Sequence, residues 1–301
     1  MKTNCLALAL SSGFLLFACS RPEDKTTTDV TTDSTSSLRT GLSESLTFHA
    51  SFDHGGDADF GSGDLKLYSI ENNKSQKLSE GLGNPPLELD TAAGNFNSAL
   101  SFTKENTHVV LYKVEKNIAY SRDSFKGTFS FWMSTDPNEI PGQYCDPIQI
   151  TDKDYSNAAI WVDITKNDSP PDLRMGVFGD QPVWDVSNRK GESEEFFWRL
   201  HKVAEPPLGK GKWTHVAITW DGVNDTKQGR AKLYLNGEYK GSSSIIREPF
   251  TWDVANARLR LGTGDYIGLF DDVAAFNRSL GPEEIQFLYN LDHGVAELYN
   301  K

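Results

Sequence analysis

Short apolar runs follow one another along the chain from about Leu46 onward. Each run is rich in aromatic and β-branched residues, and Gly, Pro, Asn and Asp separate it from the next. No long helical period of apolar residues competes with this pattern. It therefore predicts an all-β sandwich, with strands in SLTFHASF, SALSF, HVVLY, GTFSFWM, AAIWVDI, DLRMGVF, FFWRLHKV, WTHVAITW, AKLYL and RLRLG.

Two local signals refine this prediction. Asn236-Gly237 stands between two strand-like runs, and both positions of the tight turn favoured there need a positive φ. Near the end of the chain, Pro282 suits a first helical turn, and apolar residues recur after it at helical spacing. We therefore expect a β-hairpin at Asn236-Gly237 and one short C-terminal helix.

The last predicted strand, IGLFDDVAAF (267–276), carries two adjacent carboxylates. Side chains alternate between the two faces of a strand, so Asp271 should lie on one face and Asp272 on the other. An aspartate then lies on whichever face points inward. Because an unpaired carboxylate is costly in an apolar layer, it needs a metal, a basic partner or N–H donors.

Residues 1–18 predict an export signal rather than a folded segment. Lys2 begins a short positive region, and an apolar run too short for a good membrane span follows it. The stretch Leu16-Phe17-Ala18-Cys19 resembles the bacterial lipobox, although Phe17 replaces the small residue usual there. We predict a lipoprotein-type signal peptide with lipid attached to Cys19. The alternative is an ordinary signal peptide with an incidental cysteine.

The segment 19–45 is rich in Ser, Thr and Asp and has few apolar residues. It predicts a disordered tether, which leaves a single domain over 46–301. The protein would then be exported and lipid-anchored to the cell membrane or the outer membrane, facing the periplasm or the exterior. Cys145 would have no intramolecular cysteine partner after export, and we interpret it as a buried apolar side chain.

The net charge of the chain limits the classes of partner that it is expected to bind. The 301 residues include 30 Lys and Arg against 42 Asp and Glu, a formal net charge of -12. This balance disfavours nucleic acid and anionic lipid surfaces, so membrane contact is expected only through the anchor. Glycans, proteins and cations remain as partners.

Several blocks together resemble a known family: GTFSFWM (127–133), GKWTHVAITWDG (211–222), AKLYLNGEYKG (231–241) and IGLFDDVAAFNRSLGPEEIQFLYN (267–290). They are similar to the LamG-like jelly rolls of the concanavalin A-like lectin/glucanase superfamily, in particular to a subgroup of bacterial surface proteins. The resemblance implies two curved antiparallel sheets with the first and last strands side by side. It implies no particular reaction, since lectins, adhesion modules, glycosidases and lyases share this fold.

The resemblance also implies a structural calcium ion (Ca2+). Asp271 matches the aspartate of the family's Gly-x-Ile-Asp-Asp/Glu-Val block, and Asp53 lies in HASFDHGGDADFGSGD (49–64), which has a counterpart in the subgroup. We expect Asp53 and Asp271 to hold the metal, and Asp272 to find backbone or basic partners on the opposite face. The alternative is that Asp271 and Asp272 are both paired without metal.

Catalytic motifs of related enzymes are missing from the sequence. Laminarinase-type glucanases carry Glu-x-Asp-x-Glu in one strand, and this stretch does not occur. Alginate lyases carry Gln-x-His, but Gln149 is followed by Thr151 at that spacing. Arg199 and His201 would share one face of a strand, with no visible third partner. We therefore predict that the protein is not an enzyme.

Two tryptophans suggest where a ligand binds. Trp184 and Trp198 flank a polar insertion of the kind found at the rim of a sandwich, where aromatic faces stack on sugars, and Arg199 lies next to Trp198. Their alternative role is to anchor the loop. We predict a surface-anchored module that binds a glycan or a surface protein, with carbohydrate preferred. The alternatives are a polysaccharide-degrading glycosidase or lyase, and a protein-adhesion or structural envelope protein.

Overall fold

The computed structural model describes residues 27–72, 77–83, 87–104, 108–166, 171–225 and 228–300. The chain divides into two units, Met1–Ser37 and Leu38–Lys301. The predicted signal segment and Cys19 lie outside the described residues. Among the residues that are described, no helix is both long and apolar enough to cross a membrane.

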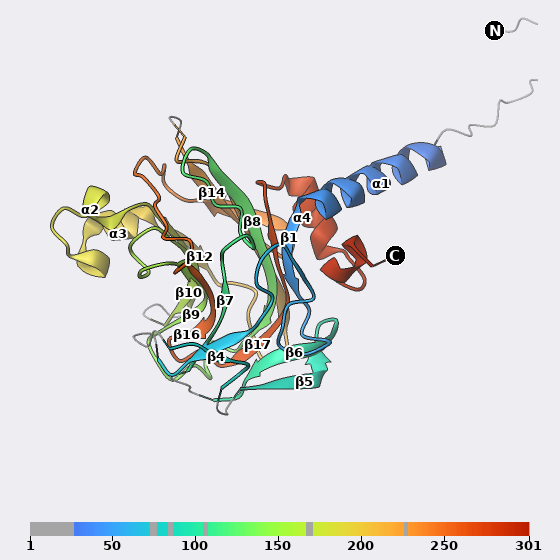
Figure 1. Ribbon diagram of the computed structural model, residues 1–301, viewed down its shortest axis with the longest axis horizontal. Helices are drawn as coiled ribbons and strands as arrows, with labels where there is room; N and C mark the ends of the chain where they lie inside the picture. The colour runs from blue at the N-terminus through green and yellow to red at the C-terminus, as the bar shows by residue number, and fades with distance from the viewer. Residues whose placement is uncertain are drawn as a thin grey trace, which may run out of the picture. The chain divides into compact units, whose positions relative to one another are not determined.

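Two antiparallel sheets form the second unit, which confirms the predicted all-β sandwich (Figure 1). The strands of the first, sheet A, run in the order β15 (Glu238–Ser242), β14 (Arg230–Leu235), β13 (Trp213–Val223), β8 (Phe125–Ser134), β17 (Gly268–Phe276), β1 (Leu46–Ala50) and β2 (Phe60–Gly61), and β6 (Asn97–Phe102) joins β17 to β5 (Leu87–Gly94). The strands of the second, sheet B, run in the order β12 (His201–Ala204), β11 (Asp172–Phe178), β10 (Ala159–Thr165), β9 (Tyr144–Thr151), β16 (Arg258–Thr263), β7 (Val109–Lys113), β3 (Tyr68–Ile70) and β4 (Ser79–Glu80).

The helices are short apart from the first. They are α1 (Thr27–Ser45), α2 (Gln181–Trp184), α3 (Glu194–Arg199) and α4 (Pro282–Tyr289), with 3-10 turns η1 (Lys190–Glu192) and η2 (Val295–Leu298). The first and last strands of the sandwich, β1 and β17, pair side by side, as the family resemblance implies.

Alternating side chains build the main core between the sheets. Phe129 and Phe131 of sheet A and Ile148 and Ile150 of sheet B are completely buried there. The residues between them point to the outer faces. Each sheet thus has a second face, and these two outer faces carry the candidate sites.

Two local predictions are confirmed. Asn236 and Gly237 have φ values of 51° and 80°, as the tight turn between β14 and β15 requires. Helix α4 begins at Pro282, and the side chain of Glu284 accepts a hydrogen bond from the Gly281 N–H at 2.9 Å. Its apolar side packs onto the outer face of sheet A together with η2.

The predicted tether differs from the structure at its C-terminal end. Helix α1 continues to Ser45, and the compact unit begins at Leu38 rather than at Leu46. Leu42 is completely buried, and Arg39 forms a 3.0 Å ion pair with Glu297. Burial and this ion pair offset the entropy of ordering a segment whose composition resembles disordered chains.

The predicted strand FFWRLHKV is wrong in its first half. Residues 194–199 form α3, and only His201–Ala204 continue as β12. The Ser193 side chain caps α3 by accepting a hydrogen bond from the Phe196 N–H at 3.2 Å, and two glutamates occupy the first turn. Arg199 and His201 therefore do not share a strand face.

Candidate functional site

A β-bulge in β17 decides where the adjacent aspartates lie. Asp271 pairs with Trp132 of β8, whereas the next pair joins Ala274 to Ser130, so β17 has one residue more than β8. Asp272 is the bulged residue, and its backbone has a positive φ of 52°. Both aspartates consequently lie on the outer face of sheet A. The expectation that they occupy opposite faces is wrong, because the bulge interrupts the alternation.

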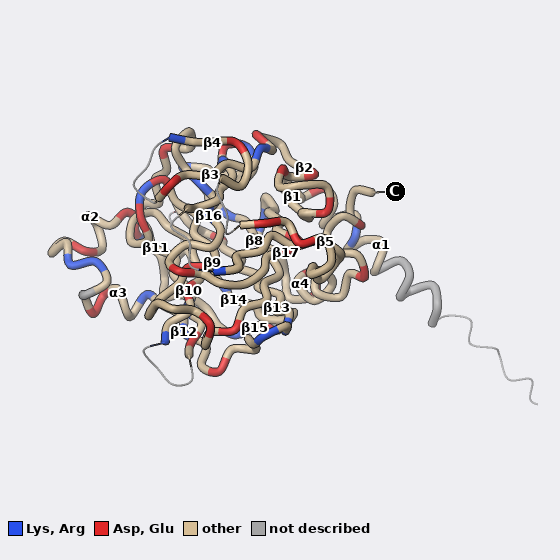
Figure 2. The backbone as a smooth tube through the Cα atoms, turned by 90° about the horizontal axis from the view of Figure 1, so that it is seen from below, with Lys and Arg blue, Asp and Glu red and all other residues tan. Residues whose placement is uncertain are grey.

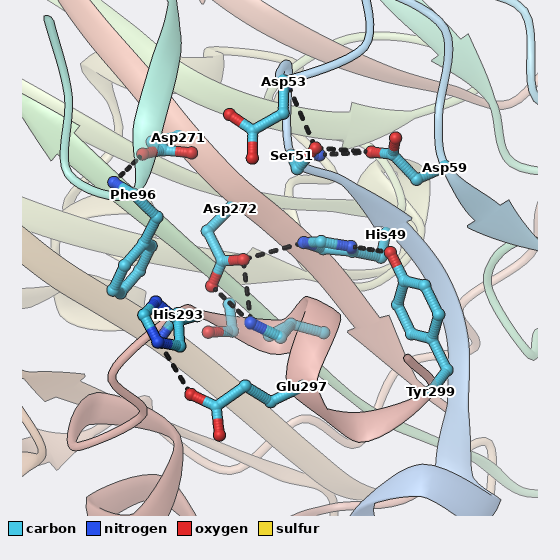
Figure 3. A network of polar contacts seen from close by, with 12 residues as sticks. His49, Ser51, Asp53, Asp59, Phe96, Asp271, Asp272, His293, Glu297 and Tyr299 are labelled. Atoms are coloured by element: carbon cyan, nitrogen blue, oxygen red, sulfur yellow. Dashed lines mark hydrogen bonds and ion pairs between the residues drawn. The ribbon is translucent and has the colours of Figure 1, made fainter. Parts of the chain in front are cut away.

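Asp271 is completely buried and only half satisfied (Figure 3). Its Oδ2 accepts a hydrogen bond from the Phe96 N–H at 2.8 Å, while its Oδ1 has no hydrogen-bond partner. Burial, with a smaller effect of the Asp272 and Asp53 carboxylates, raises the pKa of Asp271 to about 8.

Asp272 has a full set of partners. Its Oδ1 lies 2.7 Å from His49 Nε2, and the Val295 N–H donates to the same oxygen at 2.9 Å. The Nδ1 of His49 lies 2.8 Å from the Tyr299 hydroxyl (Figure 3). The predicted pairing of Asp272 with backbone is confirmed, and the network joins β1 and β17 to the C-terminal segment.

Asp53 lies close enough to Asp271 for its charge to contribute to the raised pKa of that carboxyl (Figure 3). Its carboxylate accepts hydrogen bonds from the Ser98 N–H at 2.9 Å and from Asn97 Nδ2 at 3.2 Å. The described residues contain no group of three or more His, Cys, Asp or Glu side chains arranged to hold a metal. The free Oδ1 of Asp271 and the carboxylate of Asp53 nevertheless fit calcium chemically, with backbone carbonyls and water completing the oxygen set.

A larger feature lies on the outer face of sheet B, and we call it the sheet-B cavity. It has a volume of about 550 Å³. Strands β9, β10 and β11 form its floor, and the insertion that carries α2, η1 and α3 forms a wall; the lining residues are Tyr144, Asp146, Tyr155, Trp161, Asp163, Arg174, Arg189, Lys190, Gly191, Phe196 and Phe197. Figure 2 shows that both signs of charge occur along this insertion.

A cross-strand ion pair forms part of the floor. Asp163 of β10 faces Arg174 of β11, and the guanidinium binds both carboxylate oxygens, with Nε at 2.8 Å from Oδ1. The Tyr144 ring lies 5.4 Å from the same guanidinium. Beside this pair, Gly176 faces Trp161, and a Cβ atom at Gly176 would overlap the Trp161 ring. These residues form a polar and aromatic surface that is fixed by the sheet.

Asp146 lies next to the ion pair at an irregularity of β9. Strands β9 and β10 lose register between Val162 and Ile164, opposite Asp146. The Thr263 hydroxyl donates to Asp146 Oδ2 at 3.3 Å. Burial, reinforced by the Asp163 carboxylate, raises the pKa of Asp146 to about 7.

The wall presents aromatic rings to solvent. Phe197 of α3 is 54% exposed, and Tyr155 of the loop between β9 and β10, which continues the wall, is 36% exposed, whereas Phe196 is buried. Lys190 forms a 2.9 Å ion pair with Asp154, and Trp161 Nε1 donates to the Tyr155 carbonyl at 2.6 Å. The insertion is thus tied to the loop between β9 and β10, and that loop is tied to the floor.

The structure separates the predicted ligand-binding residues. Trp184 is buried, and its Nε1 donates to the Ser156 carbonyl at 3.1 Å, so it offers no free ring face and anchors the insertion. Trp198 is 70% exposed and lines a smaller cavity of about 290 Å³ together with Arg199. Arg199 is held by a 2.6 Å ion pair with Glu248.

Sequence reasoning missed the residues of the cavity floor. Trp161, Asp163 and Arg174 lie in predicted strands, at positions that alternate with core residues. A charged residue at such a position in each of two successive strands is a signal for a polar outer face. The sequence does not say that these two positions pair directly.

The chain is similar to known proteins in sequence and in structure. Residues 121–286 match the sequence model described as the concanavalin A-like lectin/glucanases superfamily. This match covers more than half of the chain, which therefore belongs to that family. A comparison with curated protein sequences found no match.

Solved structures are similar to the chain, and the similarity with a TM-score of 0.50 is a similarity of fold. Domain 4 of AbnA, a GH43 extracellular arabinanase from Geobacillus stearothermophilus in complex with arabinotriose, aligns with a TM-score of 0.50 and 19% identity, over 80% of this chain and 97% of that one. The botulinum neurotoxin serotype G binding domain aligns with a TM-score of 0.47 and 16% identity, over 81% of this chain and 50% of its own. The serotype D ligand binding domain in complex with N-acetylneuraminic acid aligns with a TM-score of 0.42 and 16% identity, over 74% and 50%. The chain thus spans about half the length of these toxin domains.

Proposed function

We propose that this protein is a non-enzymatic carbohydrate-binding module whose ligand lies in the sheet-B cavity. The observation that carries the proposal is one cavity that combines exposed rings with fixed polar groups. Tyr144, Tyr155 and Phe197 offer ring faces beside the Asp163–Arg174 ion pair. Sugars present an apolar ring face and a rim of hydroxyl groups, and this combination suits both.

The similarity to the arabinanase domain supports the proposal. That domain is described in complex with arabinotriose, and its fold matches over most of both chains. At 19% identity the likeness concerns the fold, so the choice of ligand class depends on the cavity itself.

The carboxylates of the cavity floor favour sugar binding over sugar hydrolysis. Retaining glycosidases need one carboxylate free to act as a nucleophile and another as an acid. Both oxygens of Asp163 are bonded to Arg174, which leaves Asp146 without a free carboxylate partner in the cavity lining. A glycosidase or lyase on the same fold remains the alternative, and an assay for released sugar products distinguishes it from a binding module.

Lipid attachment at Cys19 would hold the module at the cell surface, exported and facing the periplasm or the exterior. The lipobox-like sequence Leu16–Cys19 supports this part of the proposal. Partners would then be surface glycans within reach of the anchored domain.

A structural calcium ion held by Asp53 and Asp271 completes the proposal. The free Asp271 Oδ1, with Asp53 nearby, supports it. When bound, calcium would supply positive charge to the buried carboxylate and would stabilise the contact between the first and last strands.

The two exposed aromatic residues of α3 allow a matched test. Phe197 lines the sheet-B cavity and Trp198 lines the smaller one. We expect Phe197→Ala to weaken glycan binding by about 1–3 kcal/mol, because it removes a stacking surface, and Trp198→Ala to leave it nearly unchanged. A glycan array identifies the ligand, and calorimetry on the two variants measures the loss.

The reverse pattern would move the site to the smaller cavity, where Trp198 and Arg199 were expected from the sequence. Release of reducing ends or unsaturated products from a polysaccharide panel would contradict the non-enzymatic proposal. Glycan arrays without signal, combined with pull-down of a surface protein, would favour the adhesion alternative.

A further inference from the structure

Asp146 is the carboxylate of the sheet-B cavity that has no positive partner. Its Oδ2 accepts only from the Thr263 hydroxyl at 3.3 Å. Among the described residues, no lysine or arginine forms an ion pair with it, and Arg174 acts on it only at longer range. A half-buried carboxylate without a counter-ion favours a ligand that brings one.

The other charges of the cavity are already compensated or exposed. Arg174 is bonded to Asp163, and Lys190 is bonded to Asp154. Arg189 is exposed, so water screens its charge. Asp146 is therefore the carboxylate at the floor whose negative charge is not balanced by an ion pair.

The aromatic residues that line the cavity also suit a positively charged ligand. Tyr155 and Phe197 line the cavity with exposed rings, Tyr144 lies against the Arg174 guanidinium, and Trp161 is a buried part of the lining. The negative face of an aromatic ring attracts ammonium groups, most strongly where water is excluded. Aromatic rings beside a half-buried carboxylate therefore suit an amine ligand.

We propose that the sheet-B cavity selects glycans that carry a free ammonium group, that is, amino sugars without an N-acetyl group, and that Asp146 is the residue that binds the ammonium. This inference rests on the proposed carbohydrate-binding function and adds the ligand class. The sugar ring would stack on the exposed aromatic wall while the ammonium reaches the floor.

Proton release offers a readout of this contact. The charged or titratable groups around Asp146 are Asp163 and Arg174 on the neighbouring strands, Tyr144 and Cys145 on β9, Tyr155 in the loop between β9 and β10, and Arg189 and Lys190 on the insertion. The pKa of Asp146 is about 7, because burial and Asp163 disfavour the ionised form. An ammonium ligand favours that form, so binding just below neutral pH should release a proton.

The test compares three trisaccharides by calorimetry at pH 6.5 and constant ionic strength: the glucosamine trimer, the N-acetylglucosamine trimer and the glucose trimer. We expect the intact protein to bind the glucosamine trimer at least about tenfold more tightly than the other two, since a charge-assisted hydrogen bond contributes that much. Measurements in two buffers of different ionisation enthalpy should show proton release for this ligand alone.

Asp146→Asn keeps the shape of the side chain and should abolish both the preference and the proton release. Asp123→Asn, an exposed carboxylate outside the cavity lining, is the matched control and should change neither. Thermal melts of both variants verify that they are folded.

An Asp146→Asn variant that is folded and keeps the preference would overturn the inference. Equal binding of the three trisaccharides would overturn it too, while the proposed carbohydrate function would stand. Failure of every glycan on an array would refute the proposed function itself. Equal affinity for ethanolamine, which has no sugar ring, would overturn the assignment to amino sugars.

Discussion

Asp271 is completely buried, yet one of its carboxylate oxygens has no hydrogen-bond partner. A buried polar atom in this condition costs about 1–3 kcal/mol. The cost falls if the carboxyl group is protonated, which its pKa of about 8 reflects, or if a cation binds there. In the proposed calcium site, Asp53 would supply further oxygen ligands.

Asp271→Asn should separate these two possibilities. The pKa of Asp271 lies at about 8 in the folded state against an ordinary value of 3.8. Between these values the folded state keeps a proton that the unfolded state has lost, so without metal the free energy of unfolding falls as the pH rises. Calcium binds the ionised form, so its stabilising effect should be largest above pH 8. Asp271→Asn should lose this calcium response and, in chelator, should match or exceed the stability of the intact protein.

The measurement is the melting temperature at several pH values with calcium and with a chelator. Asp272→Asn serves as the contrast, because Asp272 is bonded to His49 and Val295. It should lower the melting temperature and keep the calcium response. An intact protein whose melting temperature ignores both calcium and chelator would contradict the calcium proposal.

The insertion that carries α2, η1 and α3 has a small core of its own. Trp184 packs with Phe178 and Phe196, with ring centroids 5.2 and 6.5 Å away, and Trp161 belongs to the same cluster. This core attaches the aromatic wall of the cavity to the outer face of sheet B. An element of this size depends on such packing, since its helices are too short to be stable alone.

Trp184→Ala should therefore loosen the whole insertion. Loss of a buried tryptophan costs about 3–5 kcal/mol. We expect faster hydrogen exchange over residues 181–199 and weaker glycan binding, although Trp184 does not face the cavity. Trp198→Ala, a change of the same size at an exposed position, is the matched control and should leave exchange unchanged. Unchanged exchange in Trp184→Ala would show that other contacts hold the insertion in place.

The two ends of the second unit meet on sheet A. Strand β1 pairs with β17, Arg39 of α1 pairs with Glu297 of η2, and Arg278 donates to the Gly41 carbonyl at 3.0 Å. The segment that leads to Cys19 therefore joins the domain at a point held by several elements. The aromatic cavity belongs to the other sheet, sheet B.

Cys19→Ser tests the anchor at the scale of the whole protein. If Cys19 carries the lipid, the variant should move from the membrane fraction to the soluble exported fraction, because one lipidated residue supplies the membrane affinity. Fractionation followed by immunoblotting measures this distribution. Cys5→Ser, within the predicted signal peptide, is the control and should remain with the membrane. Retention of Cys19→Ser in the membrane fraction would exclude lipid attachment at that residue.

The strands, the hairpin at Asn236-Gly237 and the C-terminal helix could be predicted because they follow from local alternation, turn geometry and helix capping. The helical start of FFWRLHKV was missed, since its apolar residues fit either structure and the Ser193 cap decided between them. The end of α1 was missed because its order depends on Glu297, far away in the sequence.

The sequence by itself determined the all-β class, the family and the presence of two carboxylates in the closing strand, because these depend on residue type and spacing. Only the tertiary structure decided which side those carboxylates face, since one extra residue in β17 reverses the alternation. It also decided that Asp146, Asp163 and Arg174 meet beneath an aromatic wall. Pairing between strands places residues that are distant in sequence side by side, and no local pattern records that register.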